Sequence, residues 1–295
     1  MMMKTGWIAP DQIDPAADKM LAGTPRLEVI PIASLVIHEW HDEQRTSPLM
    51  ARIKESGVLR NPPVVVPLQD CSQRYMVLDG ANRITTLRKM GYPHAVVQVV
   101  SPDDPGLKLY NWNHVVWGLD PSELISIIGT LHDIELVSGE EERPDLWGDC
   151  GLALIQVPRG EQFTICTPEE RLVSRVQLLN QIVDCYKDRA RLDRTNEWSV
   201  VRLTAVYPDL CGLVILPHFE IQQVLKLAGE GCLLPAGITR FTISPRALHL
   251  NYPLEAMIEN KPLEEKNSDL QRFIQERMAH KGVRYYAEAT YLFDE

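Results

Sequence analysis

The stretch that decides the fold is residues 75–83, which read YMVLDGANR. Residues 75–78 form an apolar strand-like run, and the chain then passes through Asp79 and Gly80 into a helix predicted over about 81–90. The first turn of a helix has unpaired N–H groups and a partial positive charge, so it holds phosphate readily, and glycine lets the backbone approach closely. One interpretation is a phosphate-binding turn made of Gly80, Ala81, Asn82 and Arg83. The other is a well-capped turn without a ligand.

The charged residues of this turn fit a phosphate site in different ways. Arg83 lies in the first helical turn, where its guanidinium can contact two phosphate oxygens at once. Asn82 can donate or accept a hydrogen bond beside it. Asp79 would repel a bare phosphate, which is explained if Mg²⁺ lies between them, because that ion prefers hard oxygen ligands. Asp79 could instead cap the helix.

Further strands and helices are expected on both sides of this stretch. Short strand-like runs, a helix over about 48–56 and a closing strand surround it, at residues 27–30, 35–38, 62–66 and 96–100. Alternating strands and helices of this kind indicate a compact α/β unit. Downstream, we expect a hairpin over 152–166, a helix from Thr167 to about Lys187, and paired strands at 240–244 and 247–251.

The predicted fold class is therefore α/β (α+β), with a second α/β domain packed on the first. The expected limits are an N-terminal arm (1–25), a nucleotide-binding domain (26–118), a second domain that completes the substrate site (119–255), and a C-terminal helix and strand (256–295).

Composition narrows the function classes. The chain has 295 residues and a net charge of −10, without the long basic run that nucleic-acid binding usually requires, so we do not expect nucleic acid as a partner. No apolar run approaches the roughly 18–20 residues that span a bilayer, and the N-terminus lacks the apolar segment of a secretory signal. We therefore expect a cytoplasmic location and no membrane partner. The six cysteines show no zinc or redox spacing.

A second candidate site residue is Glu39, which follows the strand-like run at 35–38. A carboxylate at the end of a strand commonly lines a cleft, where it could accept a proton from a hydroxyl nucleophile. The alternative is that Glu39 is one of several surface acids. His38 and His41 stand three positions apart, but no third metal ligand accompanies them.

Two further runs contain polar and aromatic residues. Residues 110–117 read YNWNHVVW, and Trp112 and His114 could stack on a base or shape a small-molecule pocket. An aromatic core cluster would give the same pattern. Residues 233–240 read LLPAGITR, a turn in which Thr239 and Arg240 would suit a carboxylate or phosphate, unless it is an ordinary turn between strands.

Together these signals resemble the ParB/sulfiredoxin superfamily. The resemblance covers about residues 27–255 and includes Glu39, the run NPP at 61–63, the stretch at 75–83 and Gly91. Downstream, WNH at 112–114, LPAGITR at 234–240, Arg246 and NYPL at 251–254 are similar to the free L-serine kinases of that superfamily, including the one encoded with staphyloferrin B siderophore genes. The Asp-Gly-x-x-Arg element is common to the superfamily, and its pairing with Pro-Ala-Gly-Ile-Thr-Arg is more specific.

The resemblance implies a kinase that transfers a phosphoryl group from ATP or ADP to the hydroxyl of free L-serine or a similar small amino acid. Glu39 matches the general base and Asp79 the acid beside the transferred group, with Mg²⁺ expected there. Residues 80–83 match the phosphate-binding turn. The expected substrate contacts come from Trp112, His114, Thr239 and Arg240.

Some residues depart from the family pattern. Archaeal members usually have His-His where this chain has Ala81-Asn82, and a His soon after the Thr-Arg pair, where this chain has Phe241. The sulfiredoxin pattern is absent, because no Cys precedes Asn82-Arg83. Two alternatives stay open: a ParB-like nucleotide-binding transcriptional regulator, for which the sequence lacks a basic helix-turn-helix, and a non-catalytic ligand sensor of the same fold.

Overall fold

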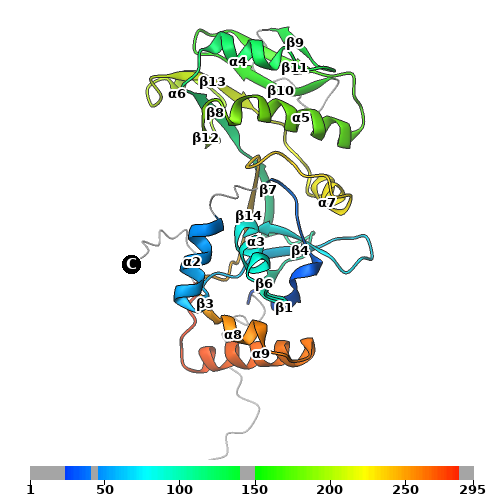
Figure 1. The fold of residues 1–295 in the computed structure, drawn as a ribbon, viewed down its shortest axis with the longest axis vertical. Helices are drawn as coiled ribbons and strands as arrows, with labels where there is room; N and C mark the ends of the chain where they lie inside the picture. Colours follow the sequence, from blue (N-terminus) through cyan, green and yellow to red (C-terminus); the bar gives the residue numbers. More distant parts are fainter. Residues whose placement is uncertain (1–23, 41–45, 140–149, 286–295) are drawn as a thin grey trace, which may run out of the picture.

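The computed structural model describes residues 24–40, 46–139 and 150–285. One sheet comes from the N-terminal part of the chain and a second from its middle (Figure 1). An antiparallel ribbon of β7 (Leu107–Asn111) and β14 (Thr239–Ile243) lies between them. Mixed sheets and helices confirm the predicted α/β (α+β) class.

The first sheet has five strands in the order β1-β6-β4-β5-β2. Its strands are β1 (Leu27–Pro31), β2 (Leu35–Ile37), β4 (Val64–Pro67), β5 (Tyr75–Asp79) and β6 (His94–Val99), and a 3-10 turn, η1 (Ile32–Ser34), joins β1 to β2. β2 runs parallel to β5, and β4 runs parallel to β6, whereas the other pairs are antiparallel.

Both faces of this sheet are buried, which explains its continuous apolar strands. Val64 and Val66 belong to the core shared with the second unit, whereas Val65 points to the opposite core. Met76 and Val77 divide in the same way, because successive side chains of a strand point to opposite faces.

Helices close the outer face of the first sheet. They are α2 (Thr46–Ser56), α3 (Ala81–Lys89), α8 (Leu254–Ile258) and α9 (Leu263–Ala279). Their buried residues Ile53, Ile84, Leu87, Met257 and Leu270 share one core with the strands. A short pair of β3 (Val58–Leu59) and β15 (Tyr252–Pro253) attaches the C-terminal part of the chain to this unit.

The second sheet has six strands in the order β12-β8-β13-β10-β11-β9. They are β8 (Asn113–Trp117), β9 (Glu135–Ser138), β10 (Gly151–Gln156), β11 (Gln162–Cys166), β12 (Arg191–Thr195) and β13 (Leu210–Ile215). Its helices are α4 (Pro121–Ile128), α5 (Leu172–Lys187) and α6 (Val200–Leu203), and α7 (Ile221–Gly229) follows β13. Figure 1 shows α5 across one face of this sheet and α7 beside the first unit.

The strand pairing indicates where the chain passes from one unit to the other. β8 precedes residue 119, yet it pairs with β12 and β13 inside the second sheet. Residues after 255 return to the first unit, where Leu270 of α9 is completely buried. We therefore propose that the chain enters the second unit through β7 and leaves it through β14.

Local expectations differ from the structure in three places. α5 starts at Leu172 instead of Thr167, because the Thr167 hydroxyl donates to the Asp133 carbonyl and accepts from the Glu169 amide, which makes a turn. Residues 247–251 form no strand, and β14 pairs with β7. The tail contains the expected helix, but residues 283–285 are not a strand, and residues 286–295 lie outside the described part.

Among the described helices, none combines the length and the apolar character needed to cross a membrane.

Candidate functional site

Glu39 and Asp79 lie at the same edge of the first sheet, where β2 and β5 end. β2 and β5 are parallel and in register, with Ile37 opposite Val77. Glu39 lies two residues after Ile37, and Asp79 lies two residues after Val77. Because the two strands are parallel, both residues lie on the same side of the sheet. Two acids separated by 40 positions in sequence are thereby brought to adjacent strand ends.

The turn between β5 and α3 requires glycine at position 80. Gly80 has φ 97°, in the left-handed region, and caps the helix. A Cβ placed there would lie 2.9 Å from Pro63 Cβ and 3.0 Å from Arg83 Nη2. Beyond it, Ala81 and Asn82 form the first turn of α3, and the Asn82 Oδ1 atom is buried without a hydrogen-bond partner in the described part of the chain. The turn thus combines a close backbone approach with an unused acceptor.

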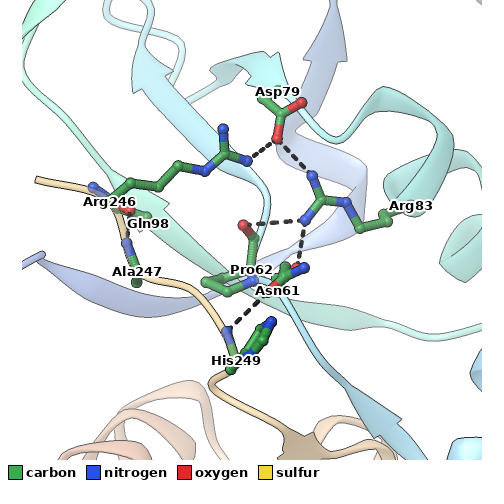
Figure 2. A network of polar contacts seen from close by, with 8 residues as sticks. All are labelled: Asn61, Pro62, Asp79, Arg83, Gln98, Arg246, Ala247 and His249. Atoms are coloured by element: carbon green, nitrogen blue, oxygen red, sulfur yellow. Dashed lines mark hydrogen bonds and ion pairs between the residues drawn. The ribbon is translucent and has the colours of Figure 1, made fainter. Parts of the chain in front are cut away.

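Arg83 is held by groups of the protein itself. Its Nη1 donates to the Asn61 carbonyl at 2.6 Å, and its Nη2 donates to Asp79 Oδ2 at 2.6 Å (Figure 2). The sequence interpretation gave this guanidinium to a phosphate. In the structure both terminal nitrogens already have partners, so a bidentate phosphate contact would require Arg83 to exchange Asp79 for the ligand.

Arg246 supplies a second cation to the same carboxylate. It lies three residues after β14, and its Nη2 pairs with Asp79 Oδ2 (Figure 2). Gln98 fixes the segment around it, donating to the Pro245 carbonyl and accepting from the Ala247 amide, both at 2.9 Å. Arg246 Nε is buried, with no hydrogen-bond partner among the described residues.

The two guanidinium groups set the charge of Asp79. Burial alone would raise the pKa of Asp79, but the charges and hydrogen bonds of Arg83 and Arg246 hold that pKa below its ordinary value. Burial lowers the pKa of Arg83, an effect that Asp79 opposes. The arrangement has one more positive than negative group, which suits an anionic ligand.

Glu39 is connected to Thr239 and His38. Glu39 Oε2 accepts from the Thr239 hydroxyl at 2.8 Å and from the Thr239 amide at 3.3 Å. His38 is 4% exposed, and its Nε2 lies 2.8 Å from the same hydroxyl. The side chain of Glu39 is 19% exposed, so it is mostly buried yet still reaches solvent.

The other predicted substrate residues divide into two groups. The Arg240 guanidinium carbon lies 4.6 Å from the Trp112 ring centre, and Trp112 N donates to the Ile238 carbonyl, so both residues adjoin Thr239. His114 lies elsewhere: it is fully buried, with Nδ1 2.8 Å from the Tyr186 hydroxyl. Burial lowers the pKa of His114 to about 4. The aromatic run therefore contributes Trp112 to this region and His114 to the core.

A divalent cation would have a single carboxylate here. The described residues contain no cluster of three or more His, Cys, Asp or Glu side chains suited to a metal. Both arginines contact Asp79 Oδ2, and its side chain is 40% exposed. One accessible carboxylate beside the turn that begins α3 fits Mg²⁺, which commonly takes one or two carboxylates and completes its shell with waters and phosphates.

Three residues that hold the site together were given no role in it from the sequence, although His38 and Asn61 lie in runs that the sequence singled out. Asn61 and Gln98 hold Arg83 and the Arg246 segment, and His38 contacts Thr239. For Asn61 a signal existed in the NPP run, because a polar residue before two prolines often fixes a turn. The other two depend on contacts between distant segments, and His41 lies outside the described residues.

The fold and the site define a class of protein: an α+β chain in which a glycine-capped helix start and a glutamate at a strand end lie on one edge of the first sheet. No family model matches the chain. The ATP-dependent L-serine kinase SbnI of Staphylococcus aureus is 22% identical over 276 residues, which cover 91% of this chain and 97% of the relative.

Solved structures show the same fold. C-terminally truncated SbnI from Staphylococcus aureus has a TM-score of 0.69 at 20% identity, covering 85% of this chain and 97% of that one. A free serine kinase in complex with AMP has a TM-score of 0.63 at 18% identity, covering 78% and 93%. The chain is thus a relative of ATP-dependent L-serine kinases, which confirms the resemblance drawn from its sequence.

Proposed function

We propose that this chain is a kinase that transfers the terminal phosphoryl group of ATP to the hydroxyl of free L-serine. The observation that carries the proposal is the shared sheet edge, where Glu39 adjoins the Asp79 turn at the start of α3. It is supported by the full-length relation to a protein named as an ATP-dependent L-serine kinase. That name favours ATP over ADP as the donor.

Phosphoryl transfer needs positioning and charge neutralisation more than covalent chemistry. Glu39 takes the proton of the serine hydroxyl as the oxygen attacks the terminal phosphorus. The bond from phosphorus to the bridging oxygen breaks, and its electron pair leaves with ADP. O-phosphoserine, ADP and a protonated Glu39 result, and the proton then passes to solvent.

The phosphates are assigned to the start of α3 and to Arg246. The first-turn amides of α3 supply N–H donors. The Arg246 Nε–H, which has no partner in the described part, is a further available donor. Arg83 has the separate task of orienting Asp79. When Mg²⁺ is bound, Asp79 would hold it, and the ion would neutralise charge on the phosphates.

The serine is assigned to the side of Thr239. Arg240 has the charge to bind a carboxylate, and Trp112 beneath its guanidinium supplies an apolar surface beside it. Nucleotide and a small amino acid are therefore the proposed partners. A cytoplasmic location accords with this function, because ATP and free serine are available there.

The decisive experiment is a product assay. The protein is incubated with Mg²⁺, ATP or ADP and L-serine, and O-phosphoserine is measured by mass spectrometry, alongside a panel of other hydroxylated amino acids. We expect product with ATP and L-serine. No product with any acceptor rejects the kinase, and calorimetry showing tight nucleotide binding without turnover would then favour the ligand sensor.

Glu39→Gln is the matched variant for this assay. It preserves the size of the side chain and removes the base, so turnover should fall by about 10²–10⁴-fold. Nucleotide affinity should stay largely intact, because Glu39 is assigned to the hydroxyl and not to the phosphates. An unchanged rate would remove Glu39 from the mechanism.

A further inference from the structure

We propose that His38 is a positioning residue that acts through the Thr239 hydroxyl and lets Glu39 hold the proton taken from the substrate. The idea deepens the proposed function and rests on it. His38, Thr239 and Glu39 would form one proton-sharing chain behind the reacting hydroxyl.

The contacts form a continuous line. His38 Nδ1 lies 2.7 Å from the Val77 carbonyl oxygen, and Nε2 lies 2.8 Å from Thr239 Oγ1. Thr239 Oγ1 lies 2.8 Å from Glu39 Oε2. All three distances are those of good hydrogen bonds, so each contact needs one proton.

The three contacts lack one proton when Glu39 is charged and His38 is neutral. The Val77 carbonyl can only accept, so His38 Nδ1 must carry a hydrogen. A neutral ring then has only a lone pair at Nε2. With Glu39 charged, the single proton of the Thr239 hydroxyl must serve two acceptors, Nε2 and the carboxylate.

One added proton completes every contact. It can reside on Glu39, which then donates to Thr239 Oγ1 while the hydroxyl donates to His38 Nε2. It can equally reside on His38, whose Nε2–H donates to Thr239 Oγ1 while the hydroxyl donates to Glu39. The two arrangements differ by the shift of two protons along the chain, and atoms and charge balance in both.

This gain coincides with the chemical step. The substrate hydroxyl loses its proton to Glu39 as the new oxygen–phosphorus bond forms, and at that moment the chain acquires its missing hydrogen bond. Burial makes the gain matter, because hydrogen bonds are stronger away from water and unsatisfied groups cost more. The positioned imidazole thereby stabilises the arrangement in which Glu39 has taken up the substrate proton.

Glu39 is a charged group that faces the His38 ring, with Nε2 4.0 Å from Oε2. β5 contributes the neutral Val77 carbonyl, and β14 contributes Thr239 and the edge of the Phe241 ring, 5.3 Å between ring centres. The environment thus links the charge of His38 to that of Glu39.

The first test needs no activity. Protein labelled with ¹⁵N-histidine is titrated by NMR, and the His38 signals are assigned from their loss in His38→Gln. Thr239→Val removes the hydroxyl that links His38 to Glu39, and Thr239→Ser keeps that hydroxyl as a matched control. The titration of the ring should move to lower pH in Thr239→Val and in Glu39→Gln, because each change removes the bridged carboxylate, and it should stay in place in Thr239→Ser. An unmoved titration in Thr239→Val overturns the proposal.

The second test uses the pH profile of kcat. In His38→Gln the amide can still contact Thr239 but cannot hold a proton. We expect kcat to fall about 10–100-fold, the KM for ATP to stay unchanged, and the acid limb to move to lower pH, because Glu39 loses proton affinity. A lower kcat with an unmoved acid limb would mean a structural role only.

The two proposals fail separately. If the wild-type protein forms no phosphorylated product, the kinase is rejected, and the NMR titration still decides whether the three residues share a proton. If the wild-type protein is active and the His38 titration is the same with and without the Thr239 hydroxyl, only the proposed proton sharing among His38, Thr239 and Glu39 is rejected.

Discussion

Asp79 and Arg246 lie 167 positions apart in sequence, and their side chains form an ion pair at the start of α3. Arg83 donates to the same Asp79 oxygen. A single carboxylate oxygen therefore connects the β5–α3 turn to the segment that returns from the second unit (Figure 2). Substitutions at this point should affect both nucleotide binding and the attachment of that segment.

Arg246→Met tests the assignment of this cation to phosphate. The change keeps much of the apolar length of the side chain and removes its charge, so the Kd for ATP should rise about tenfold or more, the scale of one charge-assisted contact. Because the ion pair is partly exposed, stability should fall by only about 1 kcal/mol. Calorimetry and urea unfolding measure the two effects.

Arg272→Met is the control for that variant. Arg272 is 67% exposed and pairs with Asp269 on the surface of α9. Its loss should change stability by less than about 0.5 kcal/mol and leave ATP binding as it was. Equal effects of the two substitutions on the Kd would remove Arg246 from the phosphate site.

Asp79→Asn should change how stability depends on pH. The pKa of Asp79 is lowered in the folded protein, so the unfolded chain takes up its proton first as pH falls. The stabilisation is fully present above the ordinary value of 3.8 and is lost as pH falls through the lowered folded value. The difference in unfolding free energy between wild type and variant should therefore shrink below about pH 4, as measured by urea unfolding at several pH values. A constant difference down to pH 2.5 contradicts the ion pairs.

Gly80→Ala compares steric crowding with backbone strain. Gly91, near the other end of α3, also has positive φ, but a Cβ there meets nothing within 4 Å. Gly91→Ala should cost about 1 kcal/mol for the left-handed backbone alone. Gly80→Ala adds the overlap with Pro63, so it should cost about 2–4 kcal/mol and weaken ATP binding. Similar costs at both positions would show that the turn relaxes freely.

The predictable part of the fold is what short segments determine by themselves. The run at 75–83 contained a β-strand, a glycine at the sharp turn and a helix start, and the structure has all three. The parallel pairing of β2 with β5 could not be predicted, because sheet pairing is set by contacts between distant segments. The same limit explains why 247–251 were expected to form a strand, whereas the structure ties Ala247 and His249 to Gln98 and Asn61 side chains.

The site shows the same division. Glu39 and Asp79 could be chosen because strand ends are where side chains meet a cleft. The partner of Arg83 could not be predicted, because an arginine in the first turn of a helix can pair with an internal carboxylate as readily as with a phosphate. His114 had the composition of a pocket residue, and only the packing of α5 against β8, through Tyr186, reveals it as a core residue.

His114→Asn separates the two roles of that histidine. The carboxamide can replace Nδ1 opposite the Tyr186 hydroxyl, so the fold should persist. The wild-type pKa of about 4 lies below the ordinary 6.5, which means that the unfolded chain binds a proton between these values while the folded protein does not. Stability is therefore complete above pH 6.5 and falls as pH drops towards 4, by up to about 3 kcal/mol at roughly 1.4 kcal/mol per unit. The variant should lose this slope in urea unfolding between pH 7 and 4, and its KM for serine should stay within about twofold of wild type. A large rise in that KM with the slope intact would return His114 to the substrate site, because only contact with the ligand could then explain it.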